Sequence, residues 1–331
     1  MILVVGAKGF LGSKLSKILK KKKISFFKID KNLKNTEKVN INNYYQLKKI
    51  FENNTIKIVI NCACEPATSK VKRNIIKTNV FGNENLIKLS TKHKVKKFIF
   101  FSTSAIWVKN YKNPVTEKTK VCPVETYGIS KVMAEKSIIN SKLDNWTIFR
   151  VPMIVSEERL GVLSILFDFI INNKKIPVLD KGQNLIQFIH IEDLIKFVLK
   201  SCSIKEKQIY NLGSEEFLSL KDLFFKLINA VNSNSKIISF KDYGYTNILS
   251  FLNRLNLSPL NIYHLKMLKY SLVMNSNKIK KKYNLKPKIR TSTMMISSLK
   301  AYKNKKKKFN NNSEITSPIK MGVIRLLYYI F

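Results

Sequence analysis

A tyrosine and a lysine four residues apart could carry out proton chemistry in this chain. Tyr127 and Lys131 are at positions i and i+4 of a predicted helix, so the phenol and the ammonium project from the same helical face. Tyrosine ionises near pH about 10, but an adjacent ammonium favours the phenolate, which can accept a proton from a hydroxyl group. In a lysine-rich chain such a pair indicates a catalytic site only together with other groups.

Hydroxyl side chains follow an apolar segment upstream of this pair. The segment Phe98 to Phe101 leads into Ser102-Thr103-Ser104, and Thr103 is 24 positions before Tyr127. Doubly wound sheets bind their ligands at the carboxyl ends of strands, so Thr103 or a neighbouring serine could hold a substrate oxygen against Tyr127. Capping or turn formation is the alternative role for these hydroxyl groups.

A glycine-rich turn lies near the N-terminus. The apolar segment Ile2 to Val5 leads directly into Gly6-Ala7-Lys8-Gly9-Phe10-Leu11-Gly12, which opens a predicted helix. Small residues make the turn tight and let the backbone approach a pyrophosphate, while the helix N-terminus supplies N–H donors and the positive end of a dipole. The turn therefore predicts a dinucleotide site, with an ordinary turn as the alternative.

Asp30 ends the second predicted strand, where a carboxylate can accept hydrogen bonds from the hydroxyls of an adenosine ribose. It would also repel a 2′-phosphate, which favours NAD over NADP, although Lys31 weakens that preference. A bound nicotinamide cation would further favour the phenolate of Tyr127. The four cysteines form no CxxC pair, so we expect reduced, mostly buried thiols and no metal site.

Apolar and amphipathic segments alternate through the first half of the chain. Strands are predicted at Ile2 to Val5, Ser25 to Ile29, Ile56 to Ile60, Lys97 to Phe101 and Trp146 to Val151, and helices at Phe10 to Lys22, Tyr44 to Glu52, Asn79 to Lys92 and Glu125 to Ser141. This alternation predicts an α/β fold with a doubly wound parallel sheet of the Rossmann type. We expect a cofactor domain over 1–155 and a smaller substrate lobe over 156–302, interleaved with the last strands. A basic linker and a short apolar tail would form 303–331.

Together these segments resemble the extended short-chain dehydrogenases/reductases, and among them the NAD-dependent epimerase/dehydratase family, to which UDP-glucose 4-epimerases belong. The glycine spacing with Phe10-Leu11 is similar to the family pattern, and the segment ending in Ile106-Trp107 resembles its STSxVYG motif, which favours Thr103 over Ser104. Further similar segments are Asn61-Cys62-Ala63, Thr78 to Gly82, Phe188 to Leu194 (FIHVxDL), Tyr210 to Gly213 (YNLG) and the closing segment 280–302. The resemblance covers residues 1 to 302.

The resemblance implies NAD as cofactor, contacted also by Asn61, Ala63 and Lys131, and a nucleotide sugar as substrate. Tyr127 would be the base and Thr103 would assist it. Dehydratases of the family carry an acid two positions after the threonine, and Ala105 occupies that position here, which leaves epimerisation or ketone reduction. A homodimer through a helix pair is also implied. The alternatives are a reductase of another carbonyl compound and a non-catalytic NAD-binding regulatory protein.

Two departures concern the substrate phosphates. The family's asparagine is missing after the strand that ends in Phe149-Arg150, and its arginine before FIHVxDL is Leu185 or Ile186. Lys181 or Arg254 could substitute, or the substrate could be a lipid-linked sugar. In the FIHVxDL segment we expect His190 to be structural and Asp193 to cap the following helix.

The chain is strongly basic, with 61 Lys and Arg against 21 Asp and Glu and a net charge of +40. The lysines are scattered and accompany no nucleic-acid-binding motif, so we expect no nucleic acid partner. The N-terminus resembles neither a signal peptide nor a membrane span, which predicts a cytoplasmic protein. Residues 303–317 suit a disordered linker, and Met321 to Phe331 is too short to span a bilayer. That tail could contact a membrane surface peripherally or dock on protein.

Overall fold

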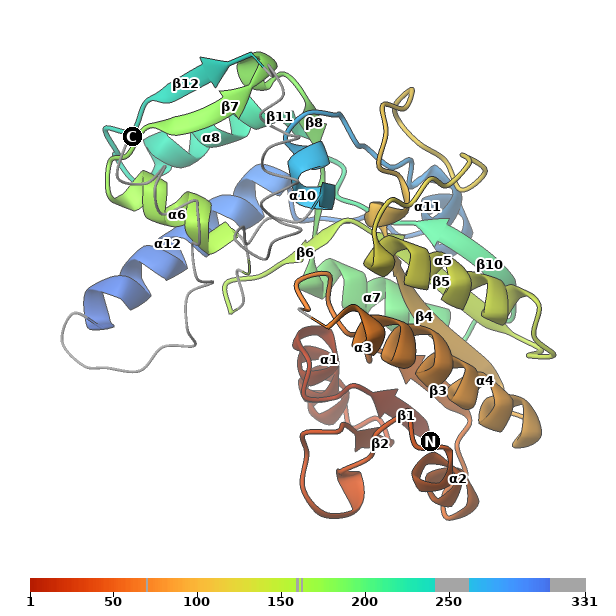
Figure 1. Ribbon diagram of the computed structural model, residues 1–331. Coiled ribbons are helices and arrows are strands. Elements are labelled where there is room, and N and C mark those ends of the chain that lie inside the picture. Colours follow the sequence, from red (N-terminus) through yellow and green to blue (C-terminus); the bar gives the residue numbers. More distant parts are fainter. Residues whose placement is uncertain (70, 159–160, 162, 242–261, 310–331) are drawn as a thin grey trace.

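A six-stranded parallel sheet forms the centre of the molecule (Figure 1). The computed structural model describes residues 1–69, 71–158, 161, 163–241 and 262–309. The strand order is β10-β5-β4-β3-β1-β2. The strands are β1 (Ile2–Val5), β2 (Phe26–Ile29), β3 (Ile58–Asn61), β4 (Lys97–Thr103), β5 (Trp146–Val151) and β10 (Lys207–Asn211). The predicted Rossmann-type α/β fold is confirmed.

Helices cover both faces of this sheet, which explains why its strands are apolar throughout. In β4, Ile99 and Phe101 point to one core and Phe98 and Phe100 to the other. The first core is closed by α1 and α7, and the second by α2, α4 and α5. These helices are α1 (Phe10–Lys21), α7 (Ile191–Ser201), α2 (Tyr44–Glu52), α4 (Asn83–Lys92) and α5 (Thr126–Ile139).

The helix predicted at Asn79 to Lys92 is the end of a longer, interrupted one. It begins as α3 (Lys72–Ile76), passes through a π-helical turn η2 (Lys77–Gly82) and continues as α4. Asn79 and Asn83 are buried at this turn, where Asn83 hydrogen-bonds to the end of β3 and Asn79 to the loop that follows β3. Single π-helical turns of this kind are frequent at functional sites.

A smaller lobe packs at the upper left of Figure 1 around a third core. Its helices are α6 (Leu163–Ile171), α8 (Leu220–Ala230), α10 (Ile262–Met267) and α12 (Thr291–Phe309). Its short strands pair as β6 (Met153–Val155) with β9 (Phe188–His190), β7 (Ile176–Leu179) with β12 (Ile237–Phe240), and β8 (Leu185–Ile186) with β11 (Leu218–Ser219). Between these elements the chain returns to the central sheet to form α7 and β10, and α11 (Asn277–Tyr283) then packs on the first core.

Asp193 does not cap α7, contrary to the prediction from its sequence. The N-cap is His190, whose Nδ1 accepts a hydrogen bond from the Glu192 N–H at 3.3 Å. The Asp193 carboxylate instead accepts hydrogen bonds from the backbone N–H groups of Lys288 and Ile289, at 2.8 and 2.7 Å. Strand β9 leads into α7 without a loop, so the imidazole already occupies the cap position.

The predicted linker is helical over its first residues, because α12 continues to Phe309. Lys303 Nζ donates to the Val231 carbonyl at 3.0 Å, and Lys306 pairs with Asp168. Residues 310–317, the tail 321–331 and Arg254 lie outside the described residues. Of the helices in the described ranges, none has the length and apolarity needed to cross a membrane.

Candidate active site

The turn after β1 brings three backbone segments into close contact. Gly6 has φ +75°, and a Cβ built there would lie 2.5 Å from the backbone nitrogen of Ala63, at the end of β3. A Cβ on Gly12 would lie 2.3 Å from the Gly6 carbonyl oxygen. Only glycine fits at either position. The strand order reverses between β1 and β3, and open α/β sheets bind their ligands at such a point.

The N-terminus of α1 faces this turn without an anionic side chain of its own. Gly9 is the N-cap and contributes no capping side chain, and the first turn contains no acid. Leu11 is buried in the first core, and the partly buried Phe10 packs against that core, so both side chains help to anchor the helix. The positive helix end and the close glycine backbone fit a pyrophosphate.

Asp30 lies beside the same turn, just after β2. Its Oδ2 accepts a hydrogen bond from the Lys8 N–H at 3.1 Å, and its Oδ1 accepts one from the Asn32 N–H at 2.9 Å. These two bonds fix the carboxylate, and its remaining lone pairs can accept from ribose hydroxyls. A cavity of about 410 Å³ adjoins it, lined by Lys8, Phe27 and residues 32–37.

The end of β3 is held by a buried amide pair. Asn61 Oδ1 accepts from the Ala63 N–H at 3.1 Å, and its Nδ2 donates to Asn83 Oδ1 at 2.9 Å. Asn61 therefore shapes the turn at Ala63 that packs on Gly6. Burial raises the pKa of the neighbouring Cys62 thiol, an effect that the Lys131 ammonium partly offsets, so Cys62 stays neutral.

The structure brings Thr103, Tyr127 and Lys131 to the carboxyl end of β4. A Cβ on Gly128 would lie 2.6 Å from the Ala105 carbonyl oxygen, so α5 rests directly on the turn η3 (Ser104–Ile106). Tyr127 packs against Ala105, two residues after Thr103. The Thr103 hydroxyl oxygen caps η3 by accepting a hydrogen bond from the Ala105 N–H at 3.1 Å, which is the alternative role expected from the sequence. A hydroxyl that accepts in this way keeps its proton for a further bond.

Lys131 is buried, and its ammonium lies between strand β4 and the Tyr127 ring. Its Nζ donates to the Phe101 carbonyl at 3.0 Å and lies 5.9 Å from the centroid of the Tyr127 ring. A buried ammonium without a carboxylate beside it acts strongly on nearby groups. In the described part of the chain, Lys131 forms no ion pair.

Sequence reasoning did not identify Asn79 as a site residue. Its Nδ2 donates to the Glu65 carbonyl and to Ser130 Oγ, both at 3.1 Å, and its Oδ1 accepts from the Glu65 N–H at 2.8 Å. Ser130 in turn donates to the Tyr127 carbonyl at 2.7 Å. Asn79 thus ties the loop after β3 to the helix that carries Tyr127. The signal available in the sequence was its place in the segment Thr78 to Gly82.

Arg150 is fully occupied by structural contacts. Its Nη2 lies 2.6 Å from Glu135 Oε2, its Nε donates to Glu135 Oε1 at 3.0 Å, and its Nη1 donates to the Glu117 carbonyl at 3.1 Å. Leu185 and Ile186 form β8, and Lys181 lies in the left-handed turn η4 (Asp180–Gly182) of the smaller lobe. The role of Lys181 at the substrate phosphates stays a prediction, and Arg254 lies outside the described residues.

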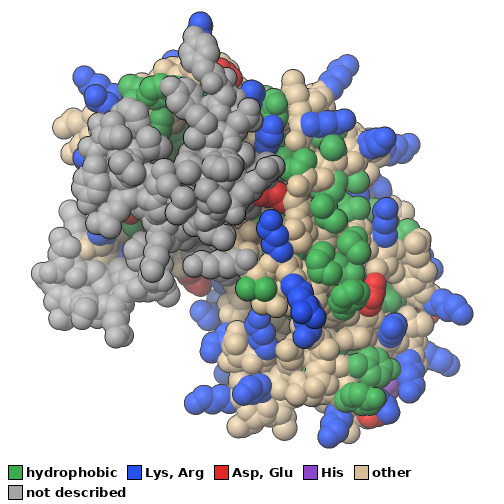
Figure 2. All heavy atoms as spheres, viewed as in Figure 1, with side chains coloured by type: hydrophobic (Ala, Val, Ile, Leu, Met, Phe, Trp, Pro, Cys, Tyr) green, Lys and Arg blue, Asp and Glu red, His purple; other side chains and the backbone are tan. Residues whose placement is uncertain are grey.

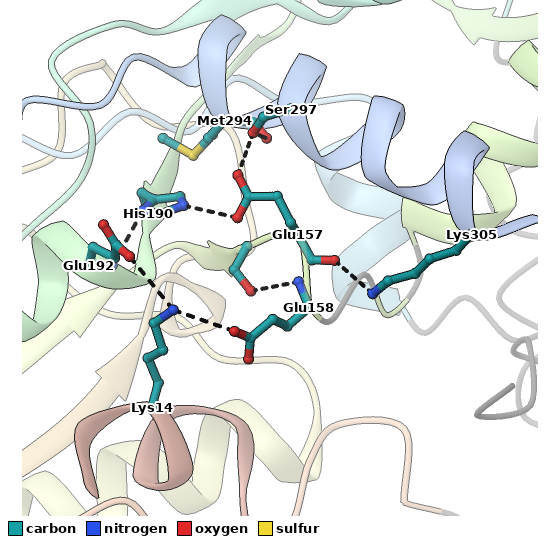
Figure 3. Close-up of polar contacts among 9 residues, drawn as sticks. Lys14, Glu157, Glu158, His190, Glu192, Met294, Ser297 and Lys305 are labelled. Carbon is teal, nitrogen blue, oxygen red and sulfur yellow. Dashed lines mark hydrogen bonds and ion pairs between the residues drawn. The ribbon is translucent and has the colours of Figure 1, made fainter. Parts of the chain in front are cut away.

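His190 belongs to a polar network between the two lobes (Figure 3). Because its Nδ1 accepts the Glu192 N–H, the proton of the neutral ring is on Nε2, which lies 3.7 Å from Glu157 Oε2. Burial raises the pKa of Glu157, but the hydrogen bond from Ser297 and the neighbouring His190 hold it below its usual range. Lys14 of α1 lies 3.4 Å from Glu158 Oε1 and 3.6 Å from Glu192 Oε1. This arrangement gives His190 a structural role.

The four cysteines of the chain are free, with Cys64 exposed and Cys62, Cys122 and Cys202 partly buried. The prediction of mostly buried thiols is therefore wrong for Cys64. Across the residues that the structure describes, no three His, Cys, Asp or Glu side chains stand close enough together to hold a metal ion.

Comparison with known proteins places this chain in a family. The model of the NAD dependent epimerase/dehydratase family matches residues 2–213. The uncharacterized protein y4nG of Sinorhizobium fredii is 28% identical over 340 residues, which cover 99% of this chain and 85% of that protein. The dTDP-4-dehydro-6-deoxyglucose reductase of Escherichia coli is 26% identical over 275 residues, 74% of this chain and 86% of the relative.

Among solved structures, the fold is similar to that of UDP-glucose 4-epimerase from Thermotoga maritima, crystallised with UDP-glucose. The TM-score is 0.73 at 18% identity, over 92% of this chain and 99% of that one. The family match extends from β1 through β10 and includes the glycine turn, Thr103, Tyr127 and Lys131. The chain belongs to the NAD dependent epimerase/dehydratase family and is an NAD-dependent enzyme of the extended short-chain dehydrogenase/reductase type.

Proposed function

We propose that this enzyme epimerises a nucleotide sugar, with Thr103, Tyr127 and Lys131 as its catalytic residues. The observation that supports the proposal is the Lys131 ammonium, held by the Phe101 carbonyl of β4 at 5.9 Å from the centroid of the Tyr127 ring, with Thr103 as the last residue of the same strand. NAD, when bound, would accept a hydride from the sugar carbon and return it. The epimerase of Thermotoga maritima, which has the same fold, was crystallised with a nucleotide sugar.

Each of the three residues has a separate part in the proposed reaction. The Tyr127 phenolate takes the proton of the sugar hydroxyl and later gives it back. Lys131, held by the Phe101 carbonyl, places a positive charge near the phenol and favours its ionised form. Thr103 donates its hydroxyl proton to the substrate oxygen and orients it toward Tyr127.

The proposed cofactor site uses the residues around the glycine turn. Gly6, Gly9 and Gly12 let the pyrophosphate reach the N-terminus of α1, where the backbone at Phe10 and Leu11 belongs to the first turn. Asp30 would accept hydrogen bonds from the adenosine ribose, and Ala63, shaped by Asn61, would line the crevice at β3. Residues 1–155 would then hold most of the cofactor contacts and residues 156–302 the sugar nucleotide.

Ala105 argues against dehydration as the reaction. It is buried beneath Tyr127 and has no ionisable group, so it cannot protonate a leaving hydroxyl. The second candidate is reduction of a keto sugar, favoured by the 26% identity to the Escherichia coli reductase. Both candidates share the Tyr127 site and differ in whether the hydride is returned to the same substrate.

The test is incubation of the purified protein with a panel of UDP-, dTDP- and GDP-sugars and NAD, and in parallel with their keto sugars and NADH. Products are followed by mass spectrometry and NMR. A product of unchanged mass and inverted stereochemistry supports the epimerase. Turnover only of keto sugars with NADH supports the reductase. Loss of water would contradict the argument from Ala105, and NAD binding with no turnover of any substrate would favour a non-catalytic protein.

We also propose a homodimer through the helix pair formed by α5 with α3 and η2, which pack side by side. Hydrophobic side chains gather over this pair on the face shown in Figure 2. Val71, Phe81, Ile129 and Met133 there are 41% to 55% exposed. Met133→Glu should halve the mass in light scattering, whereas Phe225→Glu, on the exposed side of α8, should not. A cytoplasmic location and membrane contact by residues 321–331 stay predictions from the sequence.

A further inference from the structure

An ion pair spans the two loops that flank the glycine turn. Lys31 directly follows Asp30, and its Nζ lies 3.3 Å from Glu65 Oε2 in the loop after β3. The Lys31 side chain is 55% exposed, whereas that of Glu65 is 20% exposed. A lysine next to the ribose carboxylate is the kind of cation that could bind the 2′-phosphate of NADP.

Glu65 is the fixed member of this pair. Its backbone N–H and carbonyl are both bound by the Asn79 side chain, which is buried and also held by Ser130 of α5. The backbone of Glu65 is therefore held by the turn η2, and the longer Lys31 side chain reaches the Glu65 carboxylate. Both side chains lose rotamer freedom when the pair forms, but the backbone of Glu65 is already held.

We propose that Glu65 determines the choice of NAD over NADP, by holding Lys31 away from the 2′ position of the adenosine ribose. Asp30 repels a 2′-phosphate directly, and Glu65 withholds the nearest cation that could compensate. The proposal rests on the placement of the ribose at Asp30. It assigns to Glu65 a specificity role that neither its exposure nor its place in the sequence suggests.

The net charge of the chain makes a local means of discriminating NAD from NADP necessary. With a net charge of +40, the long-range field attracts NADP more strongly than NAD, because NADP carries an additional phosphate. Discrimination must then come from groups close to the ribose. Lys8, the other lysine at Asp30, is also engaged, since its Nζ donates to the Asn32 carbonyl at 3.0 Å. Lys28, in strand β2, is paired with Glu37 at 3.5 Å.

The test is a double-mutant cycle read by cofactor binding, without any substrate. Dissociation constants of NADH and NADPH are measured by fluorescence at low ionic strength for the wild type, Glu65→Gln, Lys31→Gln and the double variant. Glu65→Gln should tighten NADPH binding up to about fivefold, the range of an exposed ion pair, and change NADH binding less than about twofold. Lys31→Gln in the Glu65→Gln background should abolish the gain.

The matched control is Glu52→Gln, which breaks the Lys48–Glu52 ion pair of 3.5 Å on α2 and removes the same charge. An equal NADPH gain in that variant, or a gain that survives Lys31→Gln, would overturn the proposal, as would unchanged NADPH binding in Glu65→Gln. Asp30→Asn tests the ribose placement separately. Unchanged NADH binding in Asp30→Asn would refute that placement, whatever Glu65→Gln does.

Discussion

Replacing Gly12 by alanine should disable the cofactor site while leaving the fold intact. The new Cβ would lie 2.3 Å from the Gly6 carbonyl oxygen and 2.9 Å from Ala7 Cα, and real Cβ contacts essentially never fall below 3.0 Å. The start of α1 must therefore move by about 0.7 Å away from the turn. Loss of two hydrogen bonds to a charged group, at about 1.5–3 kcal/mol each, would weaken NADH binding about 10²- to 10⁴-fold.

Gly9→Ala is the matched control for this prediction. Its Cβ would approach the Gly6 carbonyl oxygen only to 3.1 Å, and its φ of −70° suits any residue. We expect NADH binding to weaken less than about tenfold. Titration calorimetry with NADH gives both constants, and far-UV circular dichroism checks that α1 remains folded. Wild-type affinity in folded Gly12→Ala would refute the close-approach argument, and equal losses in both variants would show that steric distance is not the cause.

Three further predictions follow from the site and the core. Tyr127→Phe should lower turnover about 10²- to 10⁴-fold, because the proton acceptor is lost, and should leave the NADH dissociation constant within about twofold. A comparable loss of turnover and of NADH affinity would instead assign Tyr127 to cofactor binding. Glu135→Gln should lower the free energy of unfolding in urea by about 3–5 kcal/mol, because the Arg150 charge stays buried without its partner. The double variant Glu135→Leu with Arg150→Met should recover most of that loss. A loss under about 1 kcal/mol in Glu135→Gln would contradict the role of the pair. Burial lowers the pKa of Lys97 to about 8, an effect that Glu206 partly offsets, so the folded state binds fewer protons than the unfolded state between pH 8 and about 10.5. The stability of the wild type relative to Lys97→Met should therefore rise with pH in that window, by about 3 kcal/mol, and a flat difference between the two unfolding curves would disprove the shift.

The sequence was sufficient to predict the sheet and the elements around the glycine turn. The strand Trp146–Val151 and the helix Tyr44–Glu52 have the bounds predicted for them, because the strand lies between Asn145 and Pro152 and the helix between Asn43 and Asn53. The π-helical turn Lys77–Gly82 could not be predicted, since α-helix continues on both sides of it and no residue type marks such a turn. The site contacts of Asn79 depend on that turn.

Other features depend on residues distant in the chain. Asp193 was expected to cap its own helix, and its partner Ile289 lies 96 positions away. The lysines of α12 were interpreted as a solvated linker, yet lysine is a good helix former, and Lys303 reaches the Val231 carbonyl. Glu65 had no signal at all, because its partner Lys31 follows strand β2 and its partner Asn79 lies in the turn η2.

The return of the chain to the central sheet affects how the protein is made. Tyr210 of β10 and Ile279 and Tyr283 of α11 complete the core that also contains α1. During synthesis, the first 155 residues would leave the ribosome with β5 as an open sheet edge and with one face of the sheet covered only by α1, because α7 and α11 come later. The cofactor half can close only after residue 283 has emerged, so nascent chains would need protection by chaperones until most of the protein has been translated.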